Sequence, residues 1–73
     1  MIMDEIITLI RAKPFERFRL HLADGRSLQV DDPDFIARAP SGREVTIAVQ
    51  GGGFERVRMD AVERVEVIDF EAG

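Results

Sequence analysis

Several residue types that carry chemistry or reinforce small proteins are missing from this chain of 73 residues. It contains no cysteine, tryptophan or tyrosine, and its one histidine is His21. Without cysteine, the chain can form neither a disulfide nor a thiolate metal site. A core of this size stabilises a fold by only about 3–5 kcal/mol, so self-association is a common additional support.

Positive charge and long apolar runs are also scarce. The formal net charge is −4, which argues against general attraction to nucleic-acid phosphates or anionic lipids. No apolar run approaches the roughly 20 residues that span a bilayer. The opening MIMDEIITLI has acidic residues and no basic residue before its apolar stretch, unlike a signal peptide. We therefore expect one cytoplasmic domain covering residues 1–73 and no membrane association.

The first expected element is an amphipathic helix over about residues 2–12, which Pro14 ends. The i, i+3, i+4, i+7 spacing of such a helix is followed by Met3, Ile6, Ile7 and Ile10. Projected at about 100° per residue, the apolar positions span roughly 160°, more than the stripe of about 100° that covers one core. Two interpretations remain open: the helix lies deep in a groove of its own domain, or between that domain and a second subunit.

After Pro14 the apolar period changes to two, which predicts short strands. We expect these strands over about residues 16–22, 27–31, 35–38, 44–49, 54–59 and 64–68. Asp24 and Gly25 predict a tight primed hairpin turn, and a helical turn near residues 60–63 precedes the last strand. The predicted fold is mainly β with one N-terminal α-helix, in which a five- to six-stranded, strongly bent antiparallel sheet forms a small barrel.

Most of the chain, from KPFERFRLHLADGR to VERVEV, resembles a family of small bacterial proteins of unknown function. The shared pattern is PF-x-x-F-x-x-x-L-x-D-G-R, then P-x-F, G-R-x-V and V-x-x-V-x-V, and it implies no activity. The order of helix and meander, with L-x-D-G-R in the first turn, is similar to Sm-like and SH3-like small barrels, which implies a barrel that forms rings. The later RNA-contacting part of the Sm pattern is not matched, because QGGGF stands where those proteins carry an Arg-Gly or Lys-His pair.

His21 is the first candidate for chemistry, because histidine serves as a general base or a metal ligand. The strand alternation places it on a polar face beside Arg17 and Arg19, whose charge lowers the basicity of an imidazole and repels a cation. The chain offers no second histidine. We interpret His21 as a solvated strand residue, and we expect neither a catalytic residue nor enzyme activity.

Two loops have compositions that are found in ion-binding sites. Asp31, Asp32 and Asp34 offer carboxylates to a hard cation, but a calcium loop needs six or more oxygens and usually a glycine at its bend. The glycines at 51–53 resemble a phosphate cradle, but such cradles lead into a helix, whereas the following FERVRM alternates like a strand. We interpret both segments as turns, and expect no metal, cofactor or small-molecule substrate.

Four arginines define an alternative function. Arg17 and Arg19 share one strand face, Arg56 and Arg58 share another, and a barrel that brings these strands together would cluster them. An RNA-binding, Sm-like ring would use such a cluster. Aromatic stacking residues are scarce, however, and glutamates on neighbouring strands favour a surface of ion pairs, so nucleic acid is not the expected partner.

Surplus apolar side chains favour a different function. Phe54 and Ile68 are out of phase with the inward residues of their strands, and Phe70 follows the last strand. Exposed large apolar residues that cluster usually mark an interface. Together with the wide helix stripe, they predict a non-enzymatic interaction or scaffold module that forms a homo-oligomer and binds a protein partner. The candidate interface residues are Ile2, Ile6, Leu9, Phe54, Ile68 and Phe70.

Overall fold

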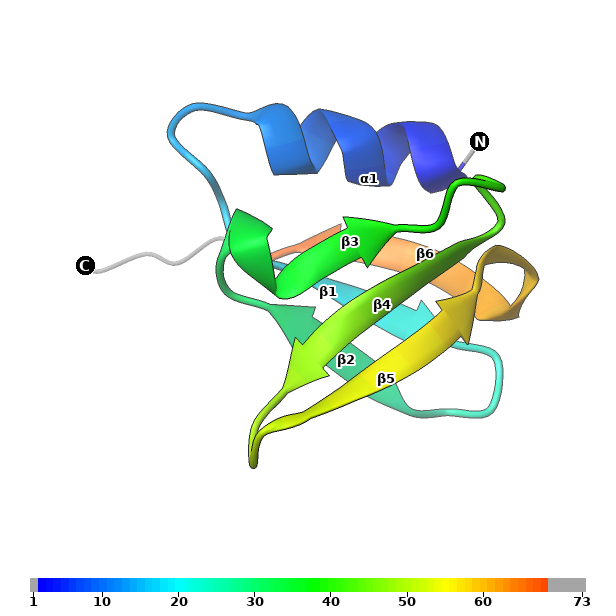
Figure 1. Ribbon diagram of the computed structural model, residues 1–73. Helices are drawn as coiled ribbons and strands as arrows, with labels where there is room; N and C mark the ends of the chain where they lie inside the picture. The colour runs from blue at the N-terminus through cyan, green and yellow to red at the C-terminus, as the bar shows by residue number, and fades with distance from the viewer. Residues whose placement is uncertain (1, 69–73) are drawn as a thin grey trace.

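A computed structural model describes residues 2–68, and its elements follow the expected order (Figure 1). In chain order they are α1 (Ile2–Arg11), β1 (Phe18–Leu22), β2 (Ser27–Val30), the 3₁₀ turn η1 (Pro33–Phe35), β3 (Ile36–Arg38), β4 (Glu44–Val49), β5 (Gly53–Arg58), the 3₁₀ turn η2 (Met59–Ala61) and β6 (Val62–Val67). The prediction of a mainly β fold with one N-terminal helix is therefore confirmed.

The strands form two separate antiparallel sheets rather than one closed sheet. The first sheet has the strand order β2-β1-β6 and the second has the order β3-β4-β5. The short turns η1 and η2 carry the chain from one sheet to the other. Within residues 2–68 neither sheet closes on itself, so the closed Sm- or SH3-like barrel expected from the sequence is not observed. Each sheet instead has two edge strands.

The break between β2 and β3 has a local cause in the segment DDPDF. Pro33 has no N–H and cannot donate to a strand ladder. Asp32 caps η1, because its Oδ1 accepts a hydrogen bond from the Asp34 N–H at 2.9 Å, and its carbonyl accepts one from the Phe35 N–H at 2.9 Å. These local bonds compete with an extended ladder. Strand β3 consequently begins at Ile36, and Phe35, which we expected in a strand, lies in η1.

The β1–β2 hairpin has its turn where the sequence predicts, but the turn is of a different type. Gly25 has a φ of 95°, and no described residue other than glycine has a positive φ. A type I′ turn requires positive φ at both central residues, which Asp24 does not provide. The Gly25 N–H donates to the Leu22 carbonyl at 3.0 Å, and the Leu22 N–H donates to the Arg26 carbonyl at 2.8 Å. The connection is thus a three-residue loop with a glycine bulge.

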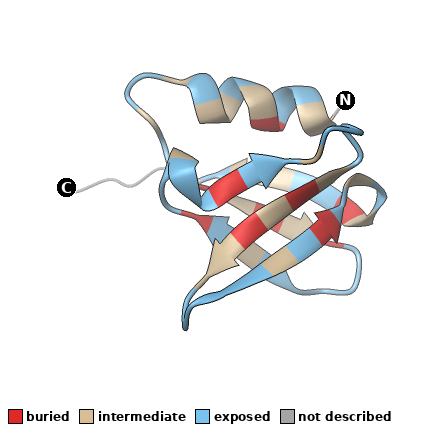
Figure 2. Cartoon of the chain, viewed as in Figure 1, coloured by how far each residue is buried: buried red, intermediate tan, exposed pale blue. Residues whose placement is uncertain are grey.

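One apolar core lies between the two sheets and against α1. Buried and less buried positions alternate along β1 and β4, as Figure 2 shows for β4, because successive side chains of a strand point to opposite faces. Leu28, which alternates with polar neighbours along β2, is only partly buried against this core. The buried apolar residues are Ile6, Phe18, Leu20, Leu22, Val30, Ile36, Val45, Ile47, Val57 and Val62.

Helix α1 lies across the top of the two sheets in the view of Figure 1 and contacts β6. Ile6 is completely buried, and Ile2, Met3, Leu9 and Ile10 are partly buried against the same core. Most of the wide apolar stripe therefore faces the helix's own domain, which agrees with the first of the two interpretations.

Candidate functional site

The two pairs of candidate arginines lie on different sheets. Arg17 and Arg19 flank a buried residue of β1 and point away from the core, and Arg56 and Arg58 do the same on β5. Strands β1 and β5 are not neighbours in either sheet. The four guanidinium groups therefore do not form one basic patch.

Polar neighbours also occupy these arginines. Arg19 Nη2 donates to Gln29 Oε1 at 2.9 Å across the β1–β2 pair. Arg58 Nη2 donates to Asp60 Oδ2 at 2.8 Å. These contacts form local polar pairs on the surface. The sequence favoured such a surface over a nucleic-acid-binding patch, because glutamates lie on the neighbouring strands.

His21 has a partner that the strand alternation alone does not reveal. Its Nε2 lies 2.8 Å from Glu66 Oε1, and its side chain is 23% exposed. The strand register places His21 opposite Arg64 and Arg19 opposite Glu66, so the imidazole reaches diagonally across β1 and β6. The hydrogen bond from His21 lowers the pKa of Glu66, with Arg64 and Arg19 acting in the same direction. His21 is consequently a half-buried cross-strand contact rather than a fully solvated residue.

The two candidate ion-binding loops have structural roles. Asp32 caps η1, and Asp31 Oδ1 accepts a hydrogen bond from Gln29 Nε2 at 2.6 Å. Gly51 and Gly52, both with positive φ, lie in the loop between β4 and β5. Over residues 2–68, no group of three or more histidine, aspartate or glutamate side chains is arranged to hold a metal ion.

The candidate interface residues have very different exposures. Ile6 is completely buried in its own core, so it has no surface left for a partner. Phe54 is 77% exposed, whereas Phe70 lies outside the described residues. The half-buried members of the set are Ile2, Leu9 and Ile68.

Leu9 borders a shallow cleft of about 390 Å³ between α1 and β6, which Val65 and Val67 also line. Val67 is 42% exposed. Val67 is in phase with Val65, so the alternation of the last strand does not distinguish it from a core residue. Strand β6 ends its sheet, so the outer row of its backbone groups has no strand partner within residues 2–68. The helix face and the last strand thus meet at an apolar, open edge.

Phe54 projects from β5, an edge strand of the second sheet. It lies opposite Ala48 on β4, whose small side chain leaves the ring largely uncovered. Arg56 is two residues further along the same face, with its Nε 3.9 Å from Glu44 Oε1. An exposed phenylalanine therefore lies on a strand that has no partner on its outer side within the described part of the chain.

Arg26 links the β1–β2 hairpin to β5. Its Nε donates to Asp24 Oδ2 at 3.0 Å, and its Nη1 donates to Glu55 Oε2 at 2.6 Å. Hydrogen bonds from the Arg26 N–H and guanidinium lower the pKa of Asp24, and those to Glu55 and Asp24 raise the pKa of Arg26. This bridge joins the start of β2 to the second sheet.

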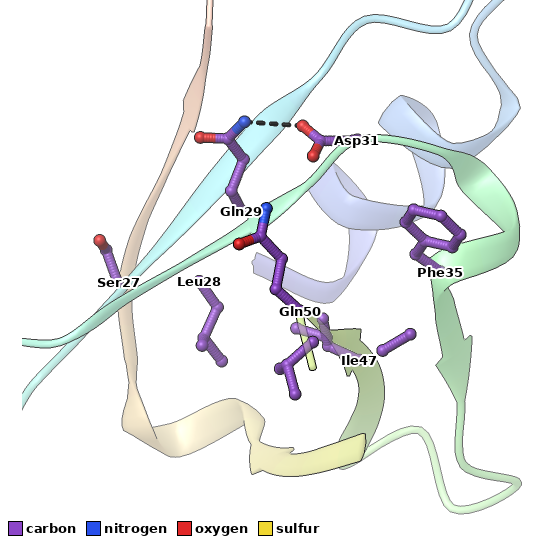
Figure 3. Close-up of a pocket in the computed structure, with 9 residues that line it drawn as sticks. Ser27, Leu28, Gln29, Asp31, Phe35, Ile47 and Gln50 are labelled. Atoms are coloured by element: carbon purple, nitrogen blue, oxygen red, sulfur yellow. Dashed lines mark hydrogen bonds between the residues drawn. The ribbon is translucent and has the colours of Figure 1, made fainter. Parts of the chain in front are cut away.

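Along β2 the two sheets are separated by a groove of about 610 Å³ (Figure 3). Strand β2 and the residue after it form one wall, η1 contributes a phenylalanine, and the end of β4 forms the other wall. The lining residues are Ser27, Leu28, Gln29, Asp31, Phe35, Ile47, Ala48, Val49 and Gln50. A closed barrel, which the sequence predicts, would leave no groove at this position.

Comparison with protein-family models, curated proteins and solved structures finds no match for this chain. None of the helical structure within residues 2–68 has the length and apolar character needed to cross a membrane. The geometry of the open edges and the groove is therefore the basis for the functional argument.

Proposed function

We propose that this protein is a non-enzymatic interaction module that self-associates through its helix face and C-terminal strand, which receive β5 of a second copy. The observation that carries the proposal is the 77% exposure of Phe54 on the edge strand β5. An exposed aromatic side chain on an open strand edge favours association, because pairing with another strand covers both the ring and the unpaired backbone groups.

The cleft between α1 and β6 supplies the complementary surface. Leu9, Val65 and Val67 supply its apolar side chains, Asp4, Glu5 and Thr8 line its helix side, and β6 offers a second open strand edge. Strands β5 and β6 each have six residues, so their lengths are matched for pairing. In this arrangement β5 of one copy adds to β6 of the next copy, and Phe54 and Leu9 are covered by the contact.

Pairing between two different edges gives a head-to-tail assembly. Such heterologous contacts produce a closed ring where the rotation between copies returns to its start, and a filament where it does not. The RNA-binding alternative gains no comparable support, because its arginine pairs lie on separate sheets.

Sedimentation velocity of the full chain at micromolar concentration tests this function. We expect species larger than the 8.2 kDa monomer, and we expect Phe54→Asp to shift them to monomer while the circular dichroism spectrum is unchanged. Phe35→Asp is the matched control, because it places the same charge on another exposed phenylalanine, 45% accessible, away from β5 and β6. A wild-type chain that sediments only as monomer would overturn the proposal.

A further inference from the structure

We propose that the groove beside β2 binds an extended peptide strand of a partner protein by adding it to the β2 edge. The peptide has apolar side chains at alternate positions and a lysine or arginine at the end next to Asp31. This inference deepens the proposed interaction function by naming a partner class, but it uses a different edge from β5 and β6.

The backbone of β2 presents the hydrogen-bonding groups that strand addition requires. Leu22 and Arg26 form a hydrogen-bonded pair at the turn, and such pairs alternate with non-bonded pairs along an antiparallel ladder. In the β1–β2 register the non-bonded positions of β2 are Ser27 and Gln29. Their N–H and C=O groups therefore point away from β1, toward the side on which β2 has no strand partner within residues 2–68.

The opposite wall of the groove is open as well. Strand β3 pairs with β4 only from Val45 to Ile47, so Ala48 and Val49 extend beyond the end of β3. Asp32 and Pro33 form the start of η1 instead of continuing the β2 strand. The chain therefore does not pair with β4 at Ala48 and Val49. A strand inserted beside β2 would occupy the place where a continuous sheet would have closed.

The walls of the groove are apolar at the positions that a peptide side chain would reach. Leu28 is only partly buried, Phe35 is 45% exposed, and Val49 lines the facing side, with the completely buried Ile47 beneath it. Figure 3 shows Leu28, Phe35 and Ile47 bordering the same space. Alternate residues of an added strand face the same side, so a peptide with apolar residues at every second position fits this lining.

The charges along the groove determine which end of the peptide carries the basic residue. Asp31 lines the groove, Asp32 is the N-cap of η1, and Asp34 lies within that turn. Arg17 Nη1 is 4.0 Å from Asp31 Oδ1, at the outer limit of an ion pair, and the three carboxylates outnumber it. At the opposite end of β2, Arg26 is already paired with Glu55 and Asp24. A basic peptide residue is therefore favoured at the Asp31 end by charge complementarity.

Two capped synthetic hexapeptides, KVTVTV and its charge-reversed twin EVTVTV, test the proposal with the ¹⁵N-labelled full chain. We expect KVTVTV to shift the amide resonances of Ser27, Gln29 and Phe35, to slow hydrogen exchange at Ser27 and Gln29, and to bind about tenfold more tightly than EVTVTV. Gln29→Pro removes one outward N–H without removing a β1–β2 ladder bond, and we expect about fivefold weaker binding.

Phe35→Asp provides a second variant in case Gln29→Pro does not fold, and it too should weaken binding. Phe54→Asp is the control, because it should leave peptide binding unchanged while abolishing self-association. The proposal is overturned by equal affinity for the two peptides, by shifts confined to β5 and β6, or by no shift at millimolar peptide. It is also overturned if Ser27 and Gln29 are already protected in the free protein, since a second copy would then occupy this edge. Each of these results leaves the test of the β5–β6 contact intact.

Discussion

At the residue scale, the contact between His21 and Glu66 gives the first sheet a defined response to acid. The hydrogen bond lowers the pKa of Glu66 in the folded chain, so the folded state binds fewer protons in the acidic range than the unfolded state. The resulting stabilisation is present above the ordinary glutamate pKa of about 4.3 and is lost as the pH falls through the lower folded pKa.

Replacing His21 with alanine should therefore raise the pKa of Glu66 toward its ordinary value and reduce the steepness of the acid-induced loss of stability. Carbon-13 NMR titration of the carboxyl group measures the pKa, and denaturant unfolding at several acidic pH values measures the stability. Glu66→Gln is the control, since it keeps an acceptor but does not titrate, and it should show the same shallower acid response. An unchanged Glu66 pKa in His21→Ala would contradict the contact.

The bulge of the first hairpin makes a second prediction at this scale. Gly25→Ala should lower the free energy of unfolding by about 1 kcal/mol, because a left-handed backbone conformation is unfavourable for a residue with a Cβ. The added Cβ meets no atom within 4 Å, so packing does not contribute. Gly25→Asn should lose less, because asparagine adopts this conformation more readily. Denaturant unfolding measures all three proteins.

Gly53→Ala is the matched control for that series. Its φ is outside the left-handed range, and an added Cβ would lie 3.7 Å from Val49 Cγ2, an ordinary contact. The change in unfolding free energy should stay within about 0.5 kcal/mol. Equal losses at Gly25 and Gly53 would show that the conformation of the bulge is not the cause.

At the scale of elements, α1 is held by one completely buried side chain, Ile6. Ile6→Ala should destabilise the fold by about 2–5 kcal/mol, and Ile6→Val by about 0.5–1.5 kcal/mol. The loss expected for Ile6→Ala is comparable to the total stability of a small domain, so this variant can fail to fold. Ile6→Val should remain folded, and its stability can be measured by thermal unfolding. Glu5→Ala, at an exposed position of the same helix, should have little effect. A valine variant as stable as wild type would show that Ile6 does not anchor the helix.

The sequence predicted the elements better than it predicted their connections. The period of two along residues 18–22 predicts an inward face that includes Phe18 and Leu20, and both side chains are completely buried, because only one face of that strand meets the core. It did not predict that Asp32 and Pro33 would close a 3₁₀ turn and leave Phe35 exposed. That outcome depends on side chain to backbone hydrogen bonds within a few residues, which apolar periodicity does not encode.

At the scale of the whole molecule, the open edges rather than single side chains make up the candidate sites. Composition and spacing identified Phe54 as a surface residue from its phase. Val67 and the β2 groove could not be found in this way, because they depend on how far α1 covers β6 and on whether the two sheets join. Ile6 was placed in the interface for a related reason: a helical projection gives the width of an apolar stripe but not the shape of the surface beneath it.

Self-association should also make the thermal stability depend on protein concentration, because association that requires the folded chain stabilises it by mass action. The unfolding midpoint of the wild type should rise as concentration increases, as measured by differential scanning calorimetry. Phe54→Asp should have a midpoint independent of concentration, and Phe35→Asp should behave like the wild type. A wild-type midpoint that is the same at every concentration would contradict coupling between folding and association.

The pairing of β1 with β6 joins the first strand of the chain to the last. Contacts between such distant segments form slowly, because a long loop must close before they are gained. During synthesis, sheet β3-β4-β5 can assemble as soon as β5 is available, whereas β1 has no partner on its second edge until β6 has been made. A nascent chain that ends before Val62 therefore has an incomplete first sheet, and we expect it to be the species that chaperones bind and proteases degrade.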